Sequence, residues 1–239
     1  MDENFDLTII IPVFNEEKNL SRVETEMLSY SHKSKLKVKF LFVNDGSTDS
    51  SQQMIEAICN KNPNFNYLEF GKNEGLSTAL KAGIDATTTQ WVGYIDSDLQ
   101  TTPDDFNLLI DFADNYELVT GIRVDRKDKI IKRISSKIAN GIRKSMTHDG
   151  VDDTGCPLKI MKTDAARNIP FFKGMHRFLP ALILLQGGKV KQIPVRHFPR
   201  IAGEAKYHLM NRLVGPFVDL LAYKWMEKKY INYTIKKKA

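Results

Sequence analysis

Short runs of apolar residues recur through the first hundred positions, and polar or turn-forming residues end each run. The runs cover residues 7–13, 38–43, 67–70 and 91–95. Continuous apolar runs of this length are typical of strands buried on both faces. The stretches between them predict helices over 16–30 and 76–86, and a helix between the second and third strands that ends near residue 59. This alternation predicts an α/β fold with a mostly parallel central sheet flanked by helices.

The second half of the chain is less regular. We predict a basic helix over 127–148, strands over 156–161 and 190–199, and a long C-terminal amphipathic helix over 208–233. The apolar face of the last helix comprises Leu209, Leu213, Phe217, Leu220, Leu221 and Trp225. We therefore divide the 239 residues into a globular domain, 1–207, and an amphipathic helix with a basic tail, 208–239.

Positive charge is concentrated toward the end of the chain, which has a net charge of +6. From residue 189 onward there are 12 lysines and arginines and three acidic residues. This balance suits phosphate, nucleic acid or an anionic lipid surface, and composition alone does not choose among them. No run reaches the roughly 18–20 apolar residues that span a bilayer. The acidic start is unlike a signal peptide, so we expect a cytoplasmic protein.

Polar side chains cluster where three of the predicted strands end. Asn15 and Glu16 follow the first strand, Asn44 and Asp45 end the second, and the segment 96–100 (Asp-Ser-Asp-Leu-Gln) follows the fourth. Ligands of parallel sheets bind at the carboxyl ends of the strands. In an extended chain Asp96, Asp98 and Gln100 would point to one side, because side chains alternate. Such a set of hard oxygen ligands suits Mg²⁺ or Mn²⁺.

Four motifs, in order, resemble the signature of family 2 glycosyltransferases. They are residues 11–16 (IPVFNE), 43–49 (VNDGSTD), 73–75 (NEG) and 96–103 (DSDLQTTP). The resemblance implies a GT-A fold and catalytic domain, a UDP- or GDP-linked sugar donor, and Mg²⁺ or Mn²⁺. It implies donor contacts from Pro12, Phe14, Glu16, Asn44, Asp45, Asp96 and Ser97, a metal site at Asp98 and Gln100, and catalytic roles for Asp96 and Asp98. Asn44 stands where many relatives have an aspartate.

Structural roles are open for some of these positions. Gly46 and Gly75 can serve only to supply turn geometry. Glu16 and Asp49 can cap the helices that follow them, the role we favour for Asp49.

The second half resembles the polyprenyl-phosphate branch of the family, which includes dolichyl-phosphate mannosyltransferases and undecaprenyl-phosphate aminoarabinose transferases. The matching segments are 120–123 (TGIR), Arg133 with two serines, 153–156 (DTGC) and 200–207 (RIAGEAKY). Ala205 stands where that branch usually has a serine. The resemblance implies an acceptor-phosphate site built from Arg123, Arg133, Ser136, Arg200 and Lys206, with Arg123 and Arg133 also catalytic, and a single displacement with inversion.

The chemistry of the acceptor supports this interpretation. A phosphate is ionised near neutral pH, so it can attack the anomeric carbon without a general base. Cations that neutralise and position the two phosphates would then suffice. We expect the enzyme to lie at the inner face of the membrane as a peripheral protein.

Several alternatives stay open from the sequence. A family 2 enzyme acting on a sugar hydroxyl would need a base, for which Asp152 or Asp153 is the candidate. A sugar-nucleotide sensor would have less need of a metal site, and no motif supports nucleic-acid binding. The C-terminal helix could lie in lipid headgroups, pack on its own domain or form a dimer, and a separate membrane subunit could recruit the enzyme.

Overall fold

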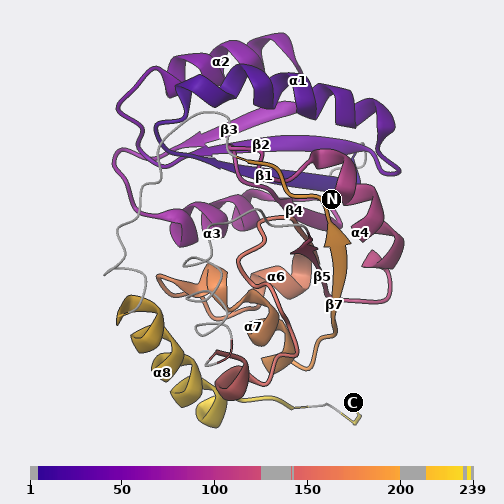
Figure 1. Cartoon of the computed structure of the whole chain (residues 1–239), viewed down its shortest axis with the longest axis vertical. Helices are drawn as coiled ribbons and strands as arrows, with labels where there is room; N and C mark the ends of the chain where they lie inside the picture. Colours follow the sequence, from indigo (N-terminus) through magenta and orange to yellow (C-terminus); the bar gives the residue numbers. More distant parts are fainter. Residues whose placement is uncertain (1–4, 125–140, 142, 200–213, 234–235, 238–239) are drawn as a thin grey trace.

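The structure, a computed structural model, describes residues 5–124, 141, 143–199, 214–233 and 236–237. Figure 1 shows a central sheet with helices on both sides. The strands are β1 (Leu7–Val13), β2 (Val38–Asn44), β3 (Phe65–Glu69), β4 (Trp91–Tyr94), β5 (Leu118–Arg123), β6 (Lys159–Lys162) and β7 (Val190–Val195). The helices are α1 (Glu17–Lys33), α2 (Ser51–Lys61), α3 (Leu76–Ala86), α4 (Phe106–Ala113), α6 (Thr163–Arg167), α7 (Leu179–Leu185) and α8 (Val214–Lys229), with 3₁₀ turns η1 (Pro103–Asp105) and η2 (Met175–Arg177).

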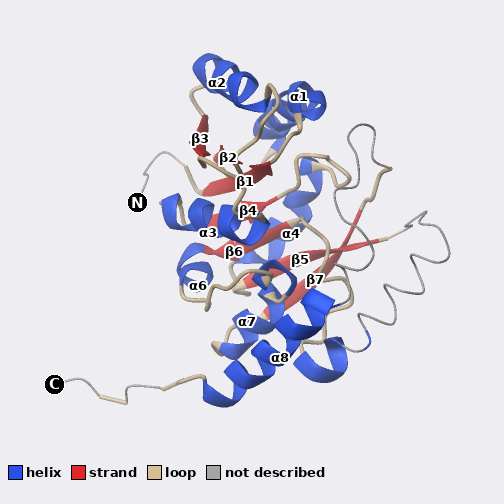
Figure 2. Cartoon of the chain, turned by 90° about the vertical axis from the view of Figure 1, so that its left-hand side faces the viewer, coloured by secondary structure: helices blue, strands red, loops and turns tan. Residues whose placement is uncertain are grey.

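The described strands form one sheet in the order β3-β2-β1-β4-β6-β5-β7. The pairs β1–β2, β1–β4, β2–β3 and β5–β7 are parallel, whereas β6 runs antiparallel to β4 and β5. Strands β5 and β7 pair in parallel from Leu118 with Val190 to Arg123 with Val195, and Figure 2 shows them next to each other. The predicted mostly parallel sheet is therefore confirmed, with β6 as its one reversed strand among the described residues.

Two apolar cores, one on each face of the sheet, hold the helices in place. On one face Ile9 and Ile11 of β1 pack with residues of α1, α2 and α4 such as Met27 and Phe106. On the other face Ile10 packs with residues of α3, α6, α7 and α8. Alternate residues of β1 point to opposite faces, so a strand with cores on both sides must be apolar throughout. This is why the first motif begins with an unbroken apolar run.

The later elements differ from the sequence prediction. The predicted strands 156–161 and 190–199 are shorter, at Lys159–Lys162 and Val190–Val195, and α4, β5, α6 and α7 were not predicted. Of the predicted helix 127–148, residues 143–147 are described and helical. Of the predicted helix 208–233, the described part is α8, and no described helix is long and apolar enough to cross a membrane. The division at residue 207 stays a prediction.

The apolar face predicted for the last helix is wrong in part. Leu220 is buried against the domain, whereas Phe217, Leu221 and Trp225 are exposed on the other side of α8. Leu209 and Leu213 lie outside the described residues. Single-sequence periodicity does not distinguish one broad apolar face from two narrower ones, because both keep the helical spacing.

Candidate active site

The three polar clusters meet at one edge of the sheet, as predicted. Val13 pairs with Asn44 at the ends of β1 and β2, and the Asp45 amide donates to the Val13 carbonyl at 2.8 Å. Residue 95, directly after β4, donates to the Ile10 carbonyl at 3.2 Å. The parallel pairing therefore brings the segments 14–16, 45–49 and 96–100 to the same end of the molecule.

Hydrogen bonds lock the loop after β1 to the loop after β2. The Asn15 amide donates to Ser47 Oγ at 2.9 Å, and Asn15 Oδ1 accepts from the Thr48 amide at 2.7 Å. Asn15 has a positive φ of 50°, a conformation that asparagine tolerates better than most residues. The Glu16 amide donates to Ser51 Oγ at 2.9 Å. The segment that carries Phe14 and Glu16 is thus fixed by the second motif.

The predicted capping role of Asp49 is confirmed, and its carboxylate binds backbone amides at the starts of two helices. Its carboxylate accepts from the Ser51 amide at 3.0 Å and from the Glu17 amide at 3.2 Å, at the starts of α2 and α1. Burial alone would raise the pKa of Asp49, but hydrogen bonds, those of Ser51 first, hold it below its ordinary value. Glu16 makes no such cap; its carboxylate accepts from the Asn19 side chain at 2.6 Å.

The carboxylate of Asp45 organises the loop that starts α3. Asp45 is buried, and it accepts from the Glu74 amide at 2.7 Å and from the Gly75 amide at 3.0–3.1 Å. Burial raises the pKa of this carboxyl group above its ordinary value, although the two backbone hydrogen bonds act against the shift. The second and third motifs, 29 residues apart, are therefore one structural unit.

Gly46 is required by the same arrangement. A Cβ at this position would lie 2.2 Å from the backbone carbonyl carbon of Lys72, and Gly46 has a φ of +68°. Asn44 is also structural: it is fully buried, its Nδ2 donates to Gln52 Oε1 at 2.8 Å, and its Oδ1 accepts from the Ser47 amide at 3.0 Å.

The segment from Asp96 to Gln100 is a turn, so the predicted extended chain with three side chains on one side is wrong. The Leu99 amide donates to the Asp96 carbonyl at 3.2 Å, and Leu99 has a φ of +47°. A leucine rarely adopts positive φ, and its side chain is held there because it is buried in the core. Asp98 Oδ1 accepts from the Gln100 amide at 3.1 Å, which brings these two residues together by a turn instead of by strand alternation.

Asp96 lies in an electrostatic environment that disfavours its ionised form. Burial, followed by the charge of Asp98, raises the pKa of Asp96 to about 6. The Tyr94 hydroxyl donates to Asp96 Oδ1 at 2.5 Å, and the charges of Lys159 and Arg123 also favour the ionised carboxylate. Lys159 is itself buried and lies opposite Tyr94 in the β4–β6 pair.

Arg123, at the end of β5, forms a bidentate ion pair with Asp153. Its Nε donates to Asp153 Oδ2 at 2.7 Å and its Nη2 to Asp153 Oδ1 at 2.8 Å. Burial would raise the pKa of Asp153, but the hydrogen bonds and charge of Arg123 hold it below its ordinary value. The predicted acceptor cation and the predicted candidate base are therefore partners of each other.

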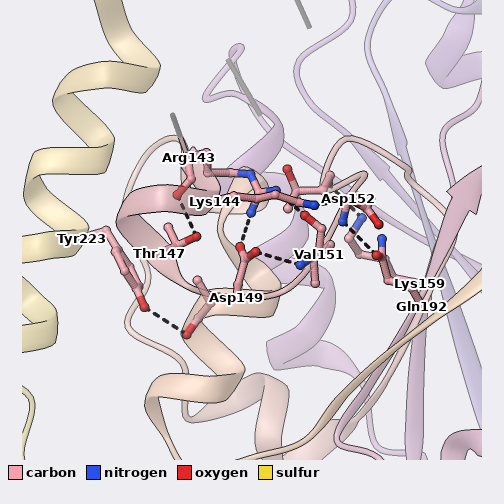
Figure 3. Close-up of polar contacts among 11 residues, drawn as sticks. Arg143, Lys144, Thr147, Asp149, Val151, Asp152, Lys159, Gln192 and Tyr223 are labelled. Carbon is pink, nitrogen blue, oxygen red and sulfur yellow. Dashed lines mark hydrogen bonds and ion pairs between the residues drawn. The ribbon is translucent and has the colours of Figure 1, made fainter. Parts of the chain in front are cut away.

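A buried polar network fixes the chain that leads to Asp153. Figure 3 shows Arg143 directed toward Asp149, with which it forms a buried ion pair, while Arg143 also donates to the Val151 carbonyl. On the other side of Asp153, Lys159 Nζ donates to the carbonyls of Thr154, at 3.2 Å, and Cys156. The position of Asp153, and through it of Arg123, is thus set from both directions.

Gln100, in the segment 96–100 that is predicted to bind a metal, contacts the chain that follows β7. The Phe198 amide donates to the Gln100 carbonyl at 2.8 Å, and Gln100 Nε2 donates back to the Phe198 carbonyl at 3.5 Å. Arg196 anchors the same segment, because its amide and guanidinium bind both oxygens of buried Asp105. The described chain that precedes the predicted acceptor motif is therefore fixed at Arg196 and Phe198.

The residues predicted to hold a divalent cation have suitable chemistry. The carboxylate of Asp98 and the amide oxygen of Gln100 are hard oxygen donors in one turn, as Mg²⁺ and Mn²⁺ prefer. Among the described residues no three His, Cys, Asp or Glu side chains form a metal cluster. A cation held here would therefore need further ligands, and Mg²⁺ commonly takes substrate phosphates.

Four predicted acceptor residues, Arg133, Ser136, Arg200 and Lys206, lie outside the described residues. Sequence reasoning missed Tyr94 and Lys159. Tyr94 stands two positions before Asp96, and residues two apart in an extended chain point to the same side, so the sequence could have predicted their contact. Lys159 gave no such signal, because only the β4–β6 pairing places it there.

Comparisons with known proteins identify the family of the chain. The family model described as "Glycosyl transferase family 2" matches residues 8–170. A dodecaprenyl-phosphate galacturonate synthase from Rhizobium johnstonii is 29% identical over 232 residues, which cover 92% of this chain and 67% of that protein. An undecaprenyl-phosphate 4-deoxy-4-formamido-L-arabinose transferase from Edwardsiella ictaluri is 29% identical over 217 residues, 90% of this chain and 66% of that protein. The chain thus spans about two thirds of the length of either relative.

Solved structures confirm the predicted GT-A fold. Glucosyl-3-phosphoglycerate synthase from Mycobacterium tuberculosis, in complex with Mn²⁺, UDP and glucosyl-3-phosphoglycerate, matches with a TM-score of 0.69 and 15% identity over 94% of this chain and 80% of that one. A mannosyltransferase from Pyrobaculum calidifontis, in complex with GDP-Man and Mn²⁺, matches with a TM-score of 0.65 and 15% identity over 97% and 66%.

Proposed function

Because this chain belongs to glycosyl transferase family 2, we propose that it transfers a sugar from a nucleotide diphosphate to a polyprenyl phosphate. The two relatives described above are named for polyprenyl-phosphate acceptors. The observation that carries the proposal is the Arg123–Asp153 ion pair. Both oxygens of Asp153 are bound by Arg123, and its pKa is lowered, so it is poorly suited to act as a general base.

The other candidate base is no better placed. Asp152 is exposed and forms an ion pair with Lys144 on the surface. A hydroxyl acceptor would have to lose a proton, whereas a phosphate arrives ionised. Because both candidate bases are paired with cations, the site suits a phosphate acceptor better than a hydroxyl acceptor.

On the donor side, we assign Asp98 and Gln100 to the cation on the diphosphate. A bound Mg²⁺ or Mn²⁺ would neutralise charge on the leaving nucleotide diphosphate. Pro12, Phe14, Glu16 and Asp45 would line the nucleotide pocket, with Asp96 and Ser97 near the ribose or sugar. Asn44 would act indirectly, because its side chain is already bonded on both sides within the loop.

On the acceptor side, Arg123, Arg133, Ser136, Arg200 and Lys206 would bind the lipid phosphate. Within the part of the chain that the structure describes, Asp153 takes Nε and one donor of Nη2, which leaves Nη1 of Arg123 with donors for an anion. The contact between Gln100 and Phe198 supports the acceptor assignment, because it ties the chain that precedes the 200–207 motif to the segment 96–100. The incoming phosphate and the departing diphosphate would then meet across the anomeric carbon, giving inversion in one displacement.

The reaction would take place at a membrane surface, since the donor is water-soluble and the acceptor chain is lipid. We place the enzyme at the inner, cytoplasmic face as a peripheral protein, directly or through a membrane subunit.

Nucleotide release from a panel of UDP- and GDP-sugars, with Mg²⁺ or Mn²⁺, tests this function. Release that requires a short-chain polyprenyl phosphate and yields a sugar-lipid product would support it and would identify the donor. Release that requires a glycan hydroxyl instead would move the enzyme to the hydroxyl-acceptor class.

Two variants separate the two halves of the site. Asp98→Ala should abolish metal-dependent turnover at limiting and at saturating acceptor. Lys206→Ala should raise the concentration of lipid phosphate needed for half-maximal rate and leave nucleotide affinity unchanged, while Lys18→Ala, at an exposed position of α1, serves as the charge-matched control. Unchanged turnover of Lys206→Ala at limiting acceptor would contradict the phosphate-binding role.

A further inference from the structure

Helix α8 has two apolar faces, and only one of them is covered by the described chain. Leu220 and Tyr223 are buried in the core that also contains α7. Figure 1 shows α8 on the outside of the molecule, beside α7. A helix that is apolar on both sides requires a partner for the second side as well.

The covered face is attached firmly. The ring of Tyr223 stacks on Phe178, with centroids 5.9 Å apart, and its hydroxyl donates to the Ala181 carbonyl at 3.5 Å. Asp219 forms an ion pair with Arg177 at 3.7 Å and packs so closely on Gly174 that a Cβ there would lie 2.2 Å from its Oδ2. The orientation of α8, and therefore of its outer face, is fixed by the domain.

The outer face is formed by Phe217, Val218, Leu221 and Trp225, a set that we call the α8 outer face. These side chains are 52%, 57%, 49% and 67% exposed. Positions 217, 221 and 225 are successive i, i+4 neighbours, and 218 and 225 are seven apart, so all four lie on one side of the helix. Their contiguity, more than the exposure of any one of them, indicates a binding surface.

The charges around the α8 outer face are positive. Lys228 and Lys229 are exposed one turn beyond Trp225, and Lys236 and Lys237 are exposed in the tail. The acidic residues of α8 are engaged elsewhere: Asp219 with Arg177, and Glu227 with Lys224. An exposed tryptophan, phenylalanine and leucine followed by lysines match an interfacial helix that meets anionic headgroups.

We propose that the α8 outer face binds an anionic lipid surface and so holds the enzyme at the membrane that contains its acceptor. The proposal rests on the proposed function only for the identity of that acceptor. A second copy of the chain fits less well, because self-association through this face would bring the lysines of both copies together without carboxylates to pair them.

The position of α8 agrees with this role. The Ser77 hydroxyl, at the start of α3, accepts from the Gly174 amide at 3.0 Å and bonds His176 Nδ1 at 2.9 Å. The preceding residues, Glu74 and Gly75, are those bound by Asp45. A continuous set of contacts thus joins the donor motif to Gly174, on which Asp219 of α8 packs, so the first half of α8 lies on the side of the molecule that carries the site.

Flotation with phosphatidylcholine vesicles, with and without phosphatidylglycerol, tests the proposal. The wild type should bind the anionic vesicles, and binding should weaken as salt is raised. The double variant L221S/W225S should bind at least about tenfold more weakly. The variant K228Q/K229Q should lose about fivefold for each lysine on anionic vesicles. The matched control Y67S/L108S changes two exposed apolar residues away from α8 and should bind as the wild type does.

Equal binding by L221S/W225S and the wild type would overturn the proposal. Failure of the wild type to bind vesicles would also overturn it, whether the protein is a monomer or a dimer in sedimentation. A dimer that L221S/W225S dissociates would identify a second copy of the chain as the partner of this face. Turnover with short-chain polyprenyl phosphate, measured without vesicles, is a separate readout. If that turnover is absent while vesicle binding depends on the α8 outer face, the proposed function fails and the membrane surface stands.

Discussion

At the scale of single residues, Asp96 and Asp98 differ sharply although one residue separates them. Asp96 accepts from the Tyr94 hydroxyl and has a pKa raised to about 6 by burial and by Asp98. Asp98 is held by the turn through the Gln100 amide. The two carboxylates influence each other, but they have different hydrogen-bond donors, the Tyr94 hydroxyl for Asp96 and the Gln100 amide for Asp98.

The raised pKa of Asp96 predicts a pH dependence of stability in metal-free protein. Because the folded pKa of about 6 exceeds the ordinary 3.8, the folded state binds more protons than the unfolded state between these values. This contribution is complete below about pH 4 and is lost as pH rises through about 6. Relative to Asp96→Asn, the free energy of unfolding of the wild type should fall by about 1–3 kcal/mol from pH 4 to pH 7. Urea unfolding in EDTA measures this; a difference that does not change with pH would contradict it.

The Arg123–Asp153 pair predicts a large loss of stability when one partner is removed. Asp153→Asn leaves a mostly buried guanidinium without its charge partner, so the free energy of unfolding at pH 7 should fall by about 2–4 kcal/mol. Asp85→Asn is the matched control, because it breaks the exposed Lys81–Asp85 pair, and should cost under about 0.5 kcal/mol. Similar losses in the two variants would show that the buried pair has no special role.

At the scale of elements, the proposed donor site consists of loops that are joined by side-chain hydrogen bonds. Asn15 joins the loop after β1 to the loop after β2, and Asp45 joins the latter to the start of α3. These loops follow parallel strands, so the sheet sets their positions and the side-chain hydrogen bonds set their conformations. Gly46 lies where two of them touch.

Gly46→Ala should therefore damage both fold and site. The new Cβ would collide with the Lys72 backbone, and alanine is strained at a φ of +68°. We expect a loss of about 2 kcal/mol or more in the free energy of unfolding, with weaker nucleotide binding. Gly71→Ala is the control, since nothing lies within 4 Å of its Cβ position, and it should change stability by about 0.5 kcal/mol or less. Equal stability of the two variants, measured by thermal and urea unfolding, would argue against the contact.

At the scale of the whole molecule, the site lies at the edge of a sheet with a separate core on each face. The donor motifs belong to β1, β2 and β4, whereas Arg123, Asp153 and Phe198 come from the β5–β7 half. Strand β6, which carries Lys159, joins the halves by pairing with β4 and β5. A ligand that contacts both halves should stabilise them together.

Nucleoside diphosphate and Mn²⁺ together should raise the melting temperature of the protein. At a nucleotide concentration 100 times its Kd the gain is about 2.7 kcal/mol, which corresponds to roughly 5–11 °C for a chain of this size. EDTA should remove most of the gain, and Asp98→Ala should show little of it. A panel of UDP and GDP in a thermal-shift assay measures this, and full stabilisation of Asp98→Ala would contradict the assignment of Asp98 to the cation.

The sequence alone determined the α/β class, the first four strands and the edge where the motifs meet. These follow from short-range information: apolar runs mark strands buried on both faces, and parallel strands place their carboxyl ends together. The resemblance to family 2 also came from contiguous motifs, and the family match over residues 8–170 confirms it. The role of Asp49 at the start of α2 was predictable because Ser51 is two residues away, whereas its contact with the Glu17 amide spans 32 residues.

Only the tertiary structure decided which groups neutralise or orient one another. The partner of Arg123 is 30 residues away, Lys159 lies beside Tyr94 through an antiparallel pairing, and Gln100 meets Phe198 across 98 positions. The turn at Leu99 depends on a core that accepts its side chain at positive φ. The split of α8 into a covered and an outer face depends on what packs against it. Such features arise from packing between distant segments, which local propensity and periodicity do not encode.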